Sequence, residues 1–218
     1  MNRLIPIIVA VVVAIAGGVY YLTQDSEPAV AQTSVETPEA SDVDTSGIPE
    51  MILGDADAPI TLIEYASYTC PHCASFHENT YPQLKADYID TGKVKFVFRE
   101  VYFDRFGLWA SQLARCGGEE RFFGITDHLM KTQSDWARAG DPVAIADAIR
   151  KIGRISGLSN EAIEACLQDE EQQKSLVAWY QTNAANDGVT GTPSFVINGT
   201  KYSNMSYADL KGILDGLL

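Results

Sequence analysis

The chain has 218 residues, of which 46% are hydrophobic and 10% aromatic, values that are ordinary for a folded protein with one sizeable core. Its formal net charge at pH 7 is strongly negative, at −13. Nucleic acids and anionic lipid surfaces are bound through clusters of Lys and Arg, so this charge balance argues against both as partners.

The first 22 residues predict a segment for a membrane or for export. The run from Leu4 to Leu22 has no charged residue and follows Arg3, and its length is close to the roughly 20 residues that cross a bilayer as a helix. Small-residue patterns at Ala14-Ile15-Ala16 and Ala29-Val30-Ala31 suit a signal peptidase. Both a cleaved signal peptide and an uncleaved signal anchor fit. Either one places the rest of the chain in the periplasm or cell envelope.

Residues 23–50 predict a disordered acidic linker. They are rich in Ser, Thr, Pro, Ala and acidic residues, a composition that buries too little apolar surface to become ordered. No internal repeat and no second linker follows. We therefore expect one folded domain over residues 51–218.

Apolar, β-branched runs predict three buried strands, at Ile60–Ala66, Val94–Phe98 and Ser194–Asn198. Between the first two, Pro71 to Asp90 has the spacing of a helix, which Pro82 should kink or divide. Two strands joined through a helix are expected to pair in parallel.

The middle of the chain, residues 104–187, shows helical spacing of apolar residues and no convincing strand. Breaks near Gly117-Gly118, Gly140-Asp141-Pro142 and Gly157 divide it into about four helices, and Gly188 closes the last one. A helical block is therefore expected between the second and third strands.

The C-terminal part predicts a tight turn at Asn198-Gly199, a short strand near Lys201 and a final helix. Ser206 should begin that helix, with Asp209 as its capping-box partner. The apolar stripe of the helix is expected to consist of Leu210, Ile213, Leu214 and Leu217.

Cys70 and Cys73 are the residues with the clearest chemistry. The ring that they can close is too small to constrain the chain, so their use must be redox or metal binding. Cys70 falls where a strand ends and a helix begins, and the free N–H groups there stabilise a thiolate. Pro71 suits the first helical turn, and His72 can add a cationic or hydrogen-bonding partner. Cys73, one turn later, should be less accessible and act as the resolving thiol.

Zinc is the alternative use of a close cysteine pair, and it needs two further soft ligands. Cys116 and Cys166 are far apart in sequence, and the histidines are His72, His77 and His128. We therefore expect no metal site. His77 is expected to be an exposed helical residue, and His128 to lie at a helix surface or boundary.

The motif Cys70-Pro71-His72-Cys73, with Glu64 before it and Thr192-Pro193 far downstream, resembles the DsbA family of thioredoxin-fold oxidases. The resemblance covers about residues 51 to 218. It implies an α/β thioredoxin fold with an inserted helical subdomain at residues 104–187. A strongly depressed cysteine pKa and an oxidising disulfide are known properties of that family, and the resemblance extends them to Cys70.

The same resemblance implies roles for residues around the pair. Pro193 would be a cis proline facing the disulfide, and the backbone at Thr192 would pair with an extended substrate segment. Glu64 would be a buried acid under Cys73 that accepts or relays its proton. Without the resemblance, Glu64 fits a solvent-facing position equally well, and Pro193 fits a plain trans proline at a strand edge.

Two features depart from the best-known members. Cys116 and Cys166 are additional cysteines in the helical block, and we expect them to form a structural disulfide. Thr192 stands where the oxidase type has Val, and Thr is shared with isomerase-like and Gram-positive-like relatives.

By resemblance, the expected function is a thiol:disulfide oxidoreductase that passes the Cys70-Cys73 disulfide to unfolded exported proteins. Its expected reoxidant is a DsbB-like membrane quinone reductase, and we expect a monomer without a cofactor. One alternative is an isomerase or reductase of the same fold. Another is a non-catalytic, chaperone-like binding module. The redox state of the cysteine pair in the cell separates the three.

Overall fold

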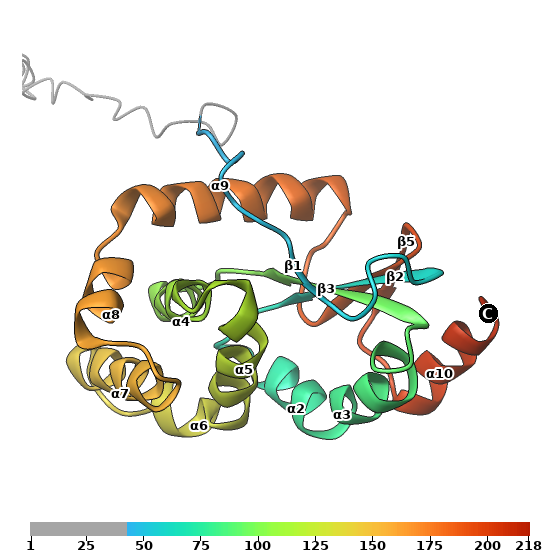
Figure 1. Cartoon of the computed structure of the whole chain (residues 1–218), viewed down its shortest axis with the longest axis horizontal. Helices are drawn as coiled ribbons and strands as arrows, with labels where there is room; N and C mark the ends of the chain where they lie inside the picture. The colour runs from blue at the N-terminus through green and yellow to red at the C-terminus, as the bar shows by residue number, and fades with distance from the viewer. Residues whose placement is uncertain (1–42) are drawn as a thin grey trace, which may run out of the picture. The chain divides into compact units, whose positions relative to one another are not determined.

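A five-stranded mixed sheet lies at the centre of the computed structural model, which describes residues 43–218 (Figure 1). The strands are β1 (Met51–Leu53), β2 (Ile60–Ala66), β3 (Val94–Glu100), β4 (Ser194–Ile197) and β5 (Thr200–Ser203). Their order across the sheet is β1-β3-β2-β4-β5. β2 and β3 are parallel, as predicted, and the other neighbouring pairs are antiparallel.

The apolar runs predicted three of these strands closely. β2 has the predicted bounds, and β3 continues two residues past Phe98 because Arg99 and Glu100 still pair with β2. β4 stops before Asn198, whose φ of 45° belongs to the predicted turn. β1 was not predicted, because three residues are too few to show a period.

Pro82 divides the helix predicted over residues 71–90. The segment forms α2 (Pro71–Asn79), α3 (Tyr81–Leu84) and the π-helix η2 (Lys85–Ile89). Proline has no N–H to continue a helix, so the break falls just before it. Phe76, Leu84 and Tyr88 are among the apolar and aromatic residues that this segment buries in the core.

The helical block between β3 and β4 contains more helices than the four expected. Within the described residues it forms α4 (Arg105–Cys116), α5 (Gly118–Lys131), α6 (Gln133–Trp136), α7 (Pro142–Ile155), α8 (Asn160–Leu167) and α9 (Glu170–Asn186). The breaks predicted at the glycines are present. The unpredicted break after Lys131 creates α6, and the one after Leu167 separates α8 from α9.

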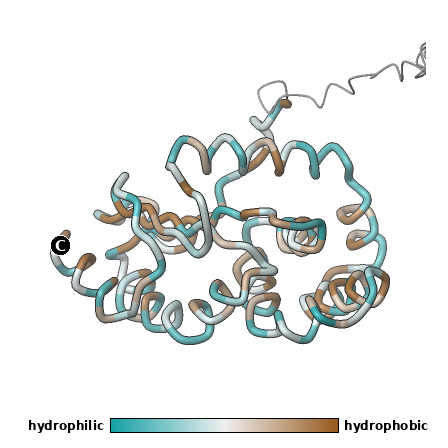
Figure 2. The backbone as a smooth tube through the Cα atoms, turned by 180° about the vertical axis from the view of Figure 1, so that it is seen from behind, coloured by the Kyte–Doolittle hydropathy of each residue, from teal (hydrophilic) through white to brown (hydrophobic). Residues whose placement is uncertain are grey.

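α9 covers one face of the sheet, and α2, α3 and α10 (Tyr207–Asp215) cover the other (Figure 1). Tyr65, Val196 and Ala184 form a small core under α9, whereas the main core includes Leu62, Phe96 and their neighbours. Hydrophobic residues lie along the central strands and also recur along the helices (Figure 2). No helix within residues 43–218 is long and apolar enough to cross a membrane.

Ser206 is the N-cap of α10, and its side chain accepts the N–H of Asp209. Leu210 and Leu214 are buried. Leu217 was expected in the same stripe but is 45% exposed, because the helix ends at Asp215.

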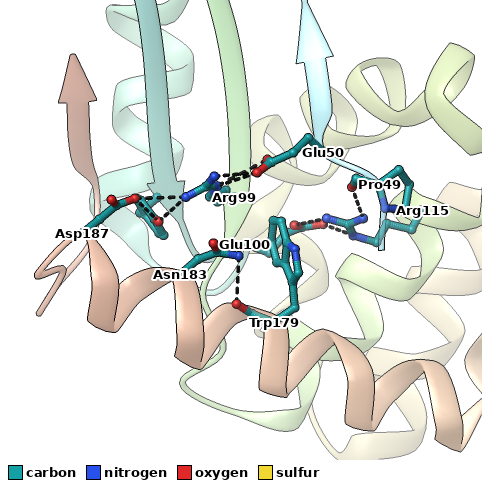
Figure 3. Close-up of polar contacts among 9 residues, drawn as sticks. Pro49, Glu50, Arg99, Glu100, Arg115, Trp179, Asn183 and Asp187 are labelled. Atoms are coloured by element: carbon teal, nitrogen blue, oxygen red, sulfur yellow. Dashed lines mark hydrogen bonds and ion pairs between the residues drawn. The ribbon is translucent and has the colours of Figure 1, made fainter. Parts of the chain in front are cut away.

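Residues before β1 contact the domain at several points. The Glu50 carboxylate pairs with Arg99, which also pairs with Asp187 at the end of α9 (Figure 3). The Pro49 carbonyl accepts a hydrogen bond from Arg115, whose guanidinium forms a buried ion pair with Glu100. The end of the segment that was assigned to the linker is therefore attached to the domain. Leu4–Leu22 and residues 23–42 lie outside the described residues.

Candidate active site

Cys70 and Cys73 lie at the start of α2, directly after the turn that follows β2. Cys70 is the N-cap residue, with φ −83° and ψ 116°, and Pro71 begins the helix. The N–H groups of Cys73 and Ala74 donate to the Cys70 carbonyl oxygen. Both thiols are free in the structure. Cys70 is 8% exposed and Cys73 is fully buried, so the sulfur that a partner can reach is that of Cys70.

The two thiols have opposite electrostatic surroundings. The pKa of Cys70 is lowered to about 5, chiefly because the Cys73 thiol donates a hydrogen bond to the Cys70 sulfur. The backbone N–H groups of Cys73 and His72 act in the same direction. Burial raises the pKa of Cys73, and the hydrogen bond to Cys70 and the charge of Glu64 raise it further. One thiolate and one thiol is therefore the favoured state of the reduced pair.

His72 is exposed, and its contribution to the Cys70 thiolate comes from its backbone N–H. The expected contribution of the imidazole stays a prediction.

The segment before β4 faces the nucleophile. The Thr192-Pro193 peptide bond is cis, and Pro193 is buried. The Cys70 sulfur lies 3.6 Å from the Thr192 carbonyl oxygen, to which it donates when it is protonated. The buried Thr192 hydroxyl has no hydrogen-bond partner among the described residues, and its nearness lowers the pKa of both Cys70 and Cys73. β4 pairs with β2, and this pairing brings two distant segments of the chain together at Cys70.

Glu64 and His77 form a buried pair beneath the helix start. Glu64 is fully buried in β2, and His77 Nε2 lies 3.0 Å and 3.2 Å from its two carboxylate oxygens. The expectation that His77 is exposed was wrong, since the residue is 2% exposed. Its position one turn after Cys73 places it on the inner side of α2, where the carboxylate supplies a polar partner.

The helical block contributes two polar contacts that the sequence did not predict. Asp104, the N-cap of α4, accepts a hydrogen bond from the Thr69 hydroxyl over 2.7 Å. Gln133, at the start of α6, donates to backbone carbonyls on both sides of Thr69. The capping signal of Asp104 was readable in the sequence, but its contact with Thr69 was not. A helix as short as α6 carries no periodic signal at all.

Cys116 and Cys166 are joined by a disulfide that links the end of α4 to the end of α8, with their Cα atoms 5.9 Å apart. Within residues 43–218, no cluster of three or more His, Cys, Asp or Glu side chains is arranged to hold a metal ion. The free thiols of Cys70 and Cys73, of which Cys70 is stabilised as a thiolate, are suited to thiol–disulfide exchange.

Known proteins share this architecture. A family model described as thioredoxin matches residues 46–216. A Rickettsia bellii protein named protein-disulfide oxidoreductase is 35% identical over 167 residues, covering 76% of this chain and 63% of that protein. A Rickettsia typhi protein of the same name is 32% identical, covering 90% of this chain and 71% of its own length. The chain thus spans less than two thirds of the first of these relatives.

Among solved structures, Wolbachia pipientis α-DsbA1 superposes with a TM-score of 0.71 at 29% identity, covering 78% of this chain and 91% of that one. The resemblance to DsbA was based on the motif Cys70-Pro71-His72-Cys73, on Glu64 and Thr192-Pro193, and on the helical insertion. The chain belongs to the thioredoxin family and, within it, to the DsbA-like thiol:disulfide oxidoreductases.

Proposed function

We propose that the protein is a thiol:disulfide oxidoreductase that donates the Cys70–Cys73 disulfide to unfolded exported proteins. The observation that carries this proposal is the opposite shift of the two thiol pKa values, to about 5 for Cys70 and upward for Cys73. A thiolate stabilised in the reduced protein favours reduction of its disulfide. Such a pair gives its disulfide away readily.

The exchange proceeds in two displacements. A substrate thiolate attacks the Cys70 sulfur, the Cys70–Cys73 bond breaks, and Cys73 leaves and takes up a proton. A second substrate thiolate then attacks the substrate sulfur of the mixed disulfide, and Cys70 leaves as the thiolate. The substrate has gained a disulfide, and the protein has gained two electrons. Cys70 is attacked first because it is the more exposed of the two sulfurs.

Glu64 and His77 support the first displacement. Cys73 leaves poorly as a thiolate in its buried position, and the nearby charge of Glu64 increases its affinity for a proton. Glu64 therefore relays a proton to Cys73, as the family resemblance implies, and His77 holds the carboxylate in place. The Thr192-Pro193 segment, on the other side of Cys70, binds the extended substrate chain.

The electrons must then leave the protein. A DsbB-like membrane quinone reductase accepts them and reoxidises the cysteine pair. The domain lies in the periplasm or cell envelope. Export rests on the apolar run Leu4–Leu22, as a signal peptide or signal anchor, with a linker before the domain.

Trapping of the mixed disulfide tests the proposal. Cys73→Ala should accumulate reducible complexes with exported proteins, because the resolving thiol is absent, whereas Cys70→Ala should not. Non-reducing gels of each variant recovered from the cell envelope give the readout. Adducts on Cys70→Ala alone would reverse the assignment of the nucleophile.

The redox state of the wild-type pair in the cell separates the remaining alternatives. A mostly oxidised pair supports the oxidase, and a mostly reduced pair supports an isomerase or reductase. Loss of both cysteines without any effect on the oxidation of exported proteins would support a non-catalytic binding module.

A further inference from the structure

The turn Ser67–Cys70 leads the chain from β2 into α2 and presents the nucleophile. It is closed by the hydrogen bond from the Cys70 N–H to the Ser67 carbonyl oxygen, 3.1 Å long. The peptide between the second and third residues of such a turn rotates between type I and type II. In this turn that peptide is the one between Tyr68 and Thr69, and its rotation changes the direction of the Tyr68 carbonyl. The direction of this carbonyl therefore determines the backbone conformation that leads into Cys70.

Gln133 binds this carbonyl from the helical block. Its Nε2 atom lies 2.9 Å from the Tyr68 carbonyl oxygen and 2.8 Å from that of Cys70, so both amide hydrogens are used. The residue is 7% exposed. The Cys70 carbonyl oxygen also accepts from the N–H groups of Cys73 and Ala74, whereas the donor to the Tyr68 carbonyl is Gln133. A buried carbonyl that loses its donor is left unsatisfied, so the contact with Tyr68 selects one geometry of the turn.

A second contact from the block supports the same turn. Asp104 accepts the Thr69 hydroxyl with one carboxylate oxygen and caps α4 with the other. Gly107, in the first turn of α4, packs closely here, since an added Cβ would lie 3.4 Å from the Ser67 hydroxyl oxygen. The turn is thus in contact with both α4 and α6.

We propose that Gln133 is a positioning residue for the Cys70 nucleophile. By fixing the carbonyls on both sides of Thr69, it holds the Cys70 sulfur against the N–H groups of His72 and Cys73. The helical block then sets the redox behaviour of the pair as well as covering it. This inference deepens the proposed function and rests on it, because it concerns the same disulfide.

The test compares two buried glutamines with the same local chemistry. Gln133→Met keeps the side-chain volume and removes both donors. Gln112→Met is the matched control, because Gln112 is fully buried and its Nε2 also bridges two backbone carbonyls, those of Cys166 at 2.7 Å and Asp169 at 3.2 Å. That contact joins α4 to the α8–α9 junction. Gln133→Asn, which keeps the amide on a shorter arm, is used as well in case the Met variant does not fold.

Three quantities are measured on each full-length variant: the thiolate titration of Cys70 by ultraviolet absorbance, the equilibrium with glutathione, and unfolding in urea. Gln133→Met should raise the pKa of Cys70 by about one unit, which makes the disulfide about tenfold less oxidising. Gln133→Asn should shift both quantities in the same direction by less. Gln112→Met should lose about as much stability as Gln133→Met. Its acid dissociation constant for Cys70 and its equilibrium constant with glutathione should both stay within about twofold of wild type.

Two results would overturn the inference. One is a wild-type thiolate pKa and glutathione equilibrium in folded Gln133 variants. The other is an equal shift in Gln112→Met, which would mean that general loosening of the helical block is the cause. Failure of the proposed function is separate, because it would appear as a wild-type protein that does not oxidise a reduced, unfolded substrate while its thiolate titration still responds to Gln133→Met.

Discussion

Acidification should lower the stability of the reduced protein, because it protonates the stabilised thiolate of Cys70. The oxidised protein has no such thiolate and should not show this loss. The pKa of Cys70 is about 5 in the folded, reduced protein, whereas a thiol in an unfolded chain has a pKa of roughly 8.5. Because the folded pKa is depressed, the stabilisation is fully present above the unfolded pKa. It is lost as the pH falls through the folded pKa.

The size of the effect follows from these two values. The thiolate contributes about 4 kcal/mol to the free energy of unfolding near pH 8, about 2.7 kcal/mol near pH 7 and about 1.4 kcal/mol near pH 6, and almost nothing below pH 5. Cys70 is only 8% exposed, so solvent screening reduces these estimates modestly. Cys73 changes these values little, because burial keeps it protonated in the folded protein and a thiol of ordinary pKa is mostly protonated up to about pH 8 in the unfolded chain.

Urea unfolding of the reduced and oxidised forms across this pH range measures the difference directly. A Cys116→Ala/Cys166→Ala background leaves only one disulfide for the reductant to act on. In the same background, the reduced Cys70→Ser variant should lack the pH-dependent contribution of the thiolate to the free energy of unfolding. If the reduced and oxidised forms differ by the same free energy at pH 8 and pH 5, the thiolate argument is wrong.

Other changes test the surroundings of the pair. His77→Leu should cost about 3–5 kcal/mol in urea unfolding, because Glu64 is left as a buried charge without a partner; His77→Gln, which keeps a donor, should cost less, and equal losses would count against the ion pair. Removing both Cys116 and Cys166 should lower stability by about 4 kcal/mol through loop entropy, with an unchanged glutathione equilibrium at the active pair. Thr192→Val should raise the pKa of the nucleophile in an absorbance titration, since one stabilising hydroxyl is lost; an unchanged pKa would show that the hydroxyl does not reach the sulfur.

Local signals in the sequence predicted the elements that carry the reaction. The β-branched run of β2 and the following Cys70-Pro71 fixed the strand-to-helix junction, because Pro71 lacks an N–H and suits only the first helical turn. The helix position alone then implied a stabilised thiolate. These inferences needed no tertiary information.

Contacts between segments distant in sequence were not predictable in the same way. His77 has the appearance of a surface residue on α2, and only the register of β2 shows that the Glu64 carboxylate lies beneath it. Gln133 lies 63 residues after Cys70, and no period or spacing relates the two. The α/β fold could therefore be predicted from the sequence, whereas the polar contacts that position the nucleophile required the three-dimensional structure.

The attachment of the segment before β1 has a mechanical consequence. Tension on the N-terminal side of the domain reaches the hydrogen bond from Ser175 to the Asp44 carbonyl oxygen first. The Arg115 and Arg99 contacts follow, and then the antiparallel ladder of β1 with β3. β1 is an edge strand, so it can peel away from β3 while β2, at the centre of the sheet, keeps both of its neighbours. A pull from the N-terminal side is thus absorbed before it can distort the junction that carries Cys70.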